Sequence, residues 1–63
     1  MDKQEIEKLE EYLIIEASRE DEEFKKLSKQ EKLEYLKESY NTTTSGNEDY
    51  ETWLTETAKA NGY

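Results

Sequence analysis

The sequence predicts an all-α fold: a small three-helix bundle with a short helical connector between helices 1 and 2. Apolar residues recur at helical spacing in three stretches of the 63-residue chain, and a residue type that favours helix N-caps precedes each stretch. The chain has no proline, and its two glycines, Gly46 and Gly62, stand outside the periodic stretches. We therefore expect a single small helical domain over residues 1–63.

Helix 1 is expected over about residues 3–19. Asp2 and Glu5 have the spacing of a capping box, in which the N-cap residue and the third helical residue bond each other's backbone amides. The apolar stripe of this helix consists of Ile6, Leu9, Leu13 and Ala17, with Ile14 at its margin. Because these positions repeat every three or four residues, they share one face that can lie on a core.

The connector, residues 19–27, is expected to contain one short helical turn from which Phe24 and Leu27 reach the core. Helix 2, about residues 29–40, has the clearest start signal, because the run Ser-Lys-Gln-Glu that begins at Ser28 fits a capping box. Its apolar stripe consists of Leu33, Leu36 and Tyr40. We expect the helix to end where this periodicity ends.

Residues 41–47 are expected to form a loop, since they are rich in β-branched and turn-forming residues. Asn47 can then cap helix 3, expected over about residues 48–60, and Gly62 is placed to end it. The core stripe of helix 3 consists of Tyr50, Trp53, Leu54, Thr57 and Ala58. These residues follow the spacing of a helix that lies on a core.

An alternative for residues 42–54 is a β-hairpin. Residues 42–44 and 50–54 contain types that favour strands, and the Ser-Gly-Asn run between them suits a tight turn. The acidic residues at positions 48 and 49 are typical of a helix start. Together with the Ala-Lys-Ala run at 58–60, they favour the helix.

Catalytic and metal-binding residue types are scarce. Cysteine and histidine are absent, which removes thiolate nucleophiles, histidine general bases and the usual zinc ligands. The chain has no nucleophile–base pair and no glycine-rich phosphate loop, and residues 20–23 lack the oxygen spacing and central glycine of an EF-hand. The sequence therefore predicts no catalytic residue, no cofactor and no metal site, and we expect a protein that is not an enzyme.

The net charge is −8, which disfavours nucleic acid and anionic membranes as direct partners because both are negative. The charge is uneven: residues 1–23 have a net charge of −7, residues 24–40 of +2 and residues 41–63 of −3. A domain this small buries a modest core, so a partner chain is one route to added stability. These features favour a larger basic protein as partner.

The candidate partner-binding residues lie on helix 1 and the connector. Tyr12 and Ile15 stand off the core stripe at 100° per residue. With the acids around them, they resemble the apolar centre and polar rim of an interface. The full set is Glu7, Glu10, Glu11, Tyr12, Ile15, Glu16, Glu20, Asp21, Glu22 and Glu23.

We interpret the chain as a small acidic protein-binding module, a regulator or inhibitor that occupies a basic surface of a larger protein. Where that surface binds nucleic acid, spaced carboxylates would replace phosphates, in the manner of a DNA mimic. The alternative is a homodimeric structural or interaction module paired through helix 1. A direct DNA-binding helix-turn-helix protein is a weaker hypothesis, because the lysine-rich residues 24–37 contain no arginine and the overall charge opposes it.

The N-terminal residues lack a basic segment followed by an apolar one, and no apolar run approaches the length of a membrane span. We therefore expect a cytoplasmic protein without membrane contact. The chain is rich in Lys, Glu, Asn and Tyr and lacks Pro and Cys. In this composition it resembles small acidic proteins of phages and mobile elements, although no motif carries the resemblance.

Overall fold

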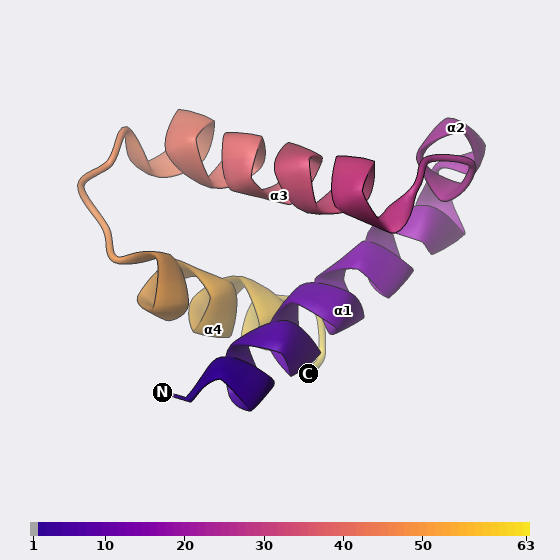
Figure 1. Ribbon diagram of the computed structural model, residues 1–63. Helices are drawn as coiled ribbons and strands as arrows, with labels where there is room; N and C mark the ends of the chain where they lie inside the picture. Colours follow the sequence, from indigo (N-terminus) through magenta and orange to yellow (C-terminus); the bar gives the residue numbers. More distant parts are fainter. Residues whose placement is uncertain (1) are drawn as a thin grey trace.

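The structure, a computed structural model, describes residues 2–63 and is all-α, as predicted. Its elements are α1 (Lys3–Glu20), α2 (Glu22–Lys25), α3 (Lys29–Thr44) and α4 (Tyr50–Ala60). Helices α3 and α4 lie on the same side of α1, and a loop joins them at the end remote from α2 (Figure 1). Residues 2–63 contain no strand, so the segment considered as a hairpin is the end of α3, a loop and the start of α4.

Asp21 lies at the corner between α1 and α2. The extended backbone of Asp21 ends α1, and its N–H donates to the carbonyl of Ala17 at 3.1 Å. The side chain of Asp21 then caps α2 by accepting from the amides of Glu23 and Phe24 at 3.0 and 3.2 Å. At the other end of α1, the carboxylate of Asp2 accepts from the backbone of Glu5 at 2.9 Å, as its spacing predicts.

Helix α3 begins with the predicted capping box. The amide of Glu31 donates to the Ser28 hydroxyl, and the amide of Ser28 donates to the Glu31 carboxylate, both at 3.2 Å. The helix continues past the predicted end at residue 40 to Thr44, whose hydroxyl donates to the carbonyl of Tyr40 at 2.8 Å. It stops at Ser45, whose φ of 56° is left-handed.

Helix α4 is capped by Asp49 and not by Asn47, the predicted cap. The Asp49 carboxylate accepts from the amide of Thr52 at 3.2 Å, so the helix begins at Tyr50. The amide of Asn47 instead donates to the carbonyl of Thr44 at 3.0 Å, within the turn that leaves α3. A carboxylate beside the positive end of the helix dipole is the more favourable N-cap acceptor here.

The C-terminal end of α4 is a Schellman motif, with Gly62 in the predicted role. Its φ is 99°, a left-handed value that favours glycine. The amide of Tyr63 donates to the carbonyl of Ala58 at 2.9 Å, and the amide of Gly62 donates to that of Lys59 at 3.1 Å. The ring of Tyr63 then contacts the ring of Tyr12 on α1, with centroids 4.9 Å apart.

The core lies between α1 and α4. Leu54 and Ala58 are fully buried. The buried cluster consists of Leu9, Leu13, Trp53, Leu54 and Ala58, and Ile14 and Phe24 are buried beside it. None of the residues of α3, all of which the structure describes, is buried; Leu36 and Tyr40 pack against the cluster from its edge. Leu27, expected in the core, is exposed because the chain turns there and its amide bonds the carbonyl of Phe24.

Substitution Leu54→Ala tests this description of the core. We expect it to lower the free energy of unfolding by about 2–5 kcal/mol, because it leaves a cavity between α1 and α4. Ile15→Ala is the matched control, since Ile15 is 49% exposed, and we expect it to change the stability by about 0.5 kcal/mol or less. Urea unfolding followed by circular dichroism measures both, and equal losses would contradict the assignment.

Candidate protein-binding site

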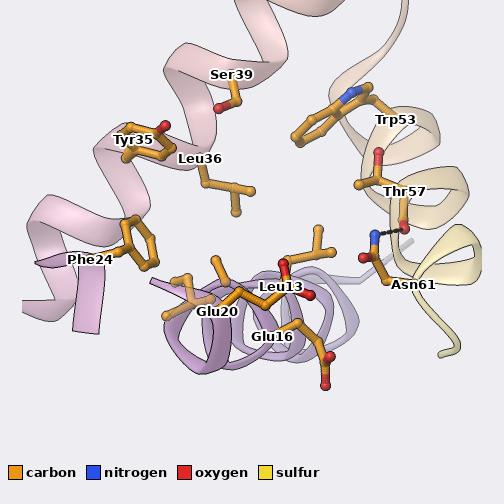
Figure 2. A pocket seen from close by; sticks show the side chains of 12 residues that line it. Leu13, Glu16, Glu20, Phe24, Tyr35, Leu36, Ser39, Trp53, Thr57 and Asn61 are labelled. Atoms are coloured by element: carbon orange, nitrogen blue, oxygen red, sulfur yellow. Dashed lines mark hydrogen bonds between the residues drawn. The ribbon is translucent and has the colours of Figure 1, made fainter. Parts of the chain in front are cut away.

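An apolar opening lies among α1, α3 and α4. Its volume is about 260 Å³. In Figure 2, α1 forms the floor, α3 one wall and α4 the other. The apolar lining consists of Leu13, Ile14, Ala17, Phe24, Tyr35, Leu36 and Trp53.

The hollow exists because small side chains stand where the helices face one another. Ala17 occupies the α1 stripe one turn after Leu13, and Ser39 stands on α3 between Leu36 and Tyr40. Both side chains are too small to fill the space between α1 and α3. Trp53 of α4 closes the far wall, and Figure 2 shows its ring directed toward the opening.

The mouth of this hollow is polar. Glu16 and Glu20 line it from α1, and Figure 2 shows the carboxylate of Glu20 at its open side. The side-chain amide of Asn61 donates to the carbonyl of Thr57 at 2.8 Å, the dashed line in Figure 2. Arg19 contacts the Glu16 carboxylate at 3.2 Å from the solvent side.

A second hollow, of about 430 Å³, adjoins the first. The two share Ala17, Glu20, Phe24 and Tyr35, and the second adds Asp21, Glu23 and Leu27. We call the two hollows together the acidic groove. Among the described residues that line it, Glu16, Glu20, Asp21 and Glu23 are charged, and there is no lysine or arginine. The groove therefore combines apolar walls with a rim whose charged residues are all acidic.

Two of the sequence-predicted residues are held in contacts with the C-terminal helix. The hydroxyl of Tyr12 donates to the carbonyl of Asn61 at 2.7 Å. The hydroxyl of Tyr50 donates to the carboxylate of Glu10 at 2.6 Å. Tyr12 and Glu10 therefore connect α1 to α4 and its C-cap, and neither of them lines the acidic groove.

Ile15 is exposed as its position on the helix predicts, but its surroundings are basic. It lines a shallow depression of about 350 Å³. The other lining residues are Ile14, Ser18, Arg19, Lys25 and Lys32. The remaining predicted residues, Glu7, Glu11 and Glu22, are exposed outside both surfaces. The predicted set is thus divided among the acidic groove, the Ile15 depression, the contact with α4 and the outer surface.

Sequence reasoning missed the walls of the groove. It placed Leu36 and Trp53 in core stripes, whereas they also line an opening to which Tyr35 contributes. The available signal was two small residues, Ala17 within the apolar stripe of the first helix and Ser39 beside that of the second. It also missed that Glu48 and Glu56 meet: a hydrogen bond to Glu56, with the charges of Glu56 and Asp49, raises the pKa of Glu48 above its usual range.

No protein-family model, curated protein or solved structure matches this chain. No group of three or more acidic residues within 2–63 has the arrangement of a metal site. Across the same residues, no helix has the length together with the apolar character needed to span a membrane.

The tyrosine that binds Glu10 has a shifted titration. Partial burial is the main cause that raises the pKa of Tyr50 above its usual range, and the hydrogen bond and charge of the Glu10 carboxylate add to it. A folded-state pKa above the unfolded value favours the folded state only while the phenol stays protonated. The stabilisation is therefore complete below the pKa of an unfolded tyrosine, about 10, and declines as the pH rises beyond it.

Substitution Tyr50→Phe should reveal this linkage. We expect the difference in unfolding free energy between the original protein and the variant to be constant from neutral pH to about 9 and to decrease above about 10. Urea unfolding midpoints across that range measure it, and the comparison cancels the titration of lysines common to both proteins. Parallel pH profiles for the two proteins would contradict the role of Tyr50.

Proposed function

We propose that this protein is an acidic binding module that occupies a basic surface of a larger protein and so regulates or inhibits it. One observation supports this most directly: four carboxylates, and no base among the described lining residues, rim the two apolar hollows of the acidic groove. An apolar centre within a polar rim is the usual anatomy of a protein interface. The sign of this rim selects a partner with lysines and arginines.

The location of these acids favours an external partner over an internal role. Glu20, Glu22 and Glu23 are exposed at the α1–α2 corner. Arg19 lies 3.2 Å from the Glu16 carboxylate and so pairs with an acid outside this corner. The overall charge of −8 adds a long-range attraction that speeds association with a cationic surface and weakens as salt screens it.

A nucleic-acid-binding protein is one class of partner with such a surface. Acting as a DNA mimic requires acids in a dense row. On the outer face of α1, Lys8 and Arg19 stand with Glu7 and Glu11, so that face is mixed in sign. The mimicry would therefore rest on residues 20–23 and the rim of the acidic groove.

Charge reversal at the rim tests the proposal. The variant Glu20→Lys/Glu23→Lys is compared with Glu7→Lys/Glu11→Lys, which changes the net charge equally but outside the groove. Asp21 is left unchanged because it caps α2. We expect basic proteins captured by the original protein at low salt to bind the rim variant at least about tenfold more weakly, a loss of about 1.4 kcal/mol.

The control variant should keep most of its binding, and moderate salt should release the captured proteins from the original. Mass spectrometry after affinity capture at low and high salt gives the identities. Capture of no basic protein, or equal loss with both variants, would contradict a function located at the rim.

A second candidate is a homodimer paired through α1, and the exposure of Ile15 favours it. In an antiparallel pairing of two α1 helices centred on Ile15, the residue four places after it on one copy faces the residue four places before it on the other. Arg19 of one copy then meets Glu11 of the other, twice by symmetry. Such a dimer would gain from apolar contact and should persist as salt rises.

Sedimentation at micromolar concentration distinguishes this candidate. A dimer paired in this way should be weakened about tenfold or more by Ile15→Glu. It should also be weakened by Arg19→Glu alone or Glu11→Arg alone, and restored when the two changes are combined. A monomer at every concentration, or a dimer indifferent to Ile15→Glu, would contradict pairing through α1.

A further inference from the structure

We infer that the acidic groove receives the apolar face of a basic amphipathic helix belonging to the partner. The inference rests on the proposed function and identifies the element that enters the site. It follows from the division of the groove into two hollows, from its walls and from the sign of its rim.

The open form of the groove suits side chains of a protein. Pockets for separate small molecules are mostly enclosed. The first hollow, of about 260 Å³, is open between α3 and α4 in Figure 2. Because the second hollow adjoins it and shares Phe24 and Tyr35, the groove offers two neighbouring hollows. Two large apolar side chains one turn apart on a partner helix are neighbours in the same way, so each could enter one hollow.

The walls come from three different elements, which is the usual construction of a groove that receives a helix. Leu13 belongs to α1, Leu36 to α3 and Trp53 to α4. Tyr35 is 58% exposed although its ring contacts Phe24 with centroids 5.3 Å apart. Apolar area is thus left facing solvent along the groove, and a partner helix would remove it from water.

The charges decide between a foreign helix and a second copy. Figure 2 shows the carboxylate of Glu16 directed away from the opening, on the side where Arg19 pairs with it. Glu20 and Glu23 are therefore the acids that attract lysines and arginines on the solvent side of an inserted helix. A second copy of this chain carries a net charge of −8, so two copies repel each other at low salt. We therefore assign the groove to a basic partner segment.

Trp53 supplies a direct readout, because it is the only tryptophan of the chain and lines the groove. Synthetic peptides without tryptophan or tyrosine can then be titrated while the fluorescence of Trp53 is followed. The first probe is an amphipathic helix of about 18 residues, with leucine and phenylalanine at i, i+3, i+4 and i+7 and lysine or arginine elsewhere. The second has the same composition in scrambled order, and the third carries glutamate in place of the basic residues.

Two kinds of variant separate apolar insertion from surface charge. Ala17→Phe fills the groove from α1 and leaves the charge unchanged, and Ser39→Phe does so from α3 should the first variant fold poorly. Glu20→Gln/Glu23→Gln removes two rim charges, and Glu7→Gln/Glu11→Gln removes two charges outside the groove as its control. Circular dichroism confirms that each variant is folded.

We expect the amphipathic peptide to bind saturably and change the fluorescence of Trp53, with the scrambled and acidic peptides at least about tenfold weaker. Ala17→Phe or Ser39→Phe should weaken the amphipathic peptide at least tenfold. Glu20→Gln/Glu23→Gln should weaken it several-fold and more than the control. A dimer seen by sedimentation and abolished by Ala17→Phe would overturn the inference in favour of a second copy.

The failures of the inference and of the proposed function differ. The amphipathic and scrambled peptides could bind equally, with binding weakened by the loss of rim charge but not by Ala17→Phe. That result would overturn insertion of a helix into the groove and would leave the proposed acidic binding surface standing. Absence of binding by either basic peptide at low salt would overturn both. Equal binding of the acidic peptide would overturn the assigned sign of the partner.

Discussion

The packing of α1 against α4 is the contact on which the rest of this fold depends. Leu54 and Ala58 are fully buried, in one cluster with Leu9 and Leu13 of α1. The contact is extended at its end by the hydrogen bond of Tyr12 to the cap of α4. A chain of this size has little apolar surface to bury, so concentrating it between two helices leaves the third less firmly held.

Helix α3 is held mainly near its two ends. Phe24 precedes it and is buried at one end. At the other, the ring of Tyr40 contacts those of Tyr50 and Trp53, with centroids 5.1 and 5.5 Å apart, and its hydroxyl donates to the carbonyl of Glu48. Between these points Leu36 contacts only the edge of the core cluster and, with Ser39, lines the opening. The acidic groove is thus a direct result of how sparsely α3 contributes to the core.

Local sequence patterns predicted the helices and most of their caps. The spacing of apolar residues and the capping roles of Ser28 and Gly62 depend only on neighbours within one or two helical turns. They failed where a distant contact decides: residues 41–44 are helical although rich in β-branched types, and they follow a tyrosine anchored on α4. The same limit applies to the site. Acids at the rim were among those predicted, but which acids face apolar walls depends on where α3 and α4 lie. The hydrogen bond from Tyr50 to Glu10 joins residues 40 positions apart, so no local sequence pattern predicts it.

The dependence of the core on α4 bears on how the polypeptide folds during its synthesis. Leu9, Leu13 and Trp53 belong to one cluster, so the face of α1 that carries Leu9 and Leu13 has no partner from α4 until residues 50–60 have left the ribosomal tunnel. The entropic cost of bringing α1 and α4 together grows only slowly with the length of chain between them. Translation nevertheless sets the order in which the helices become available, at about 5–20 residues per second. Leu9 and Leu13 of a nascent α1 therefore wait for α4 before they can be buried against it, while the negative charge of the chain opposes its association with further copies.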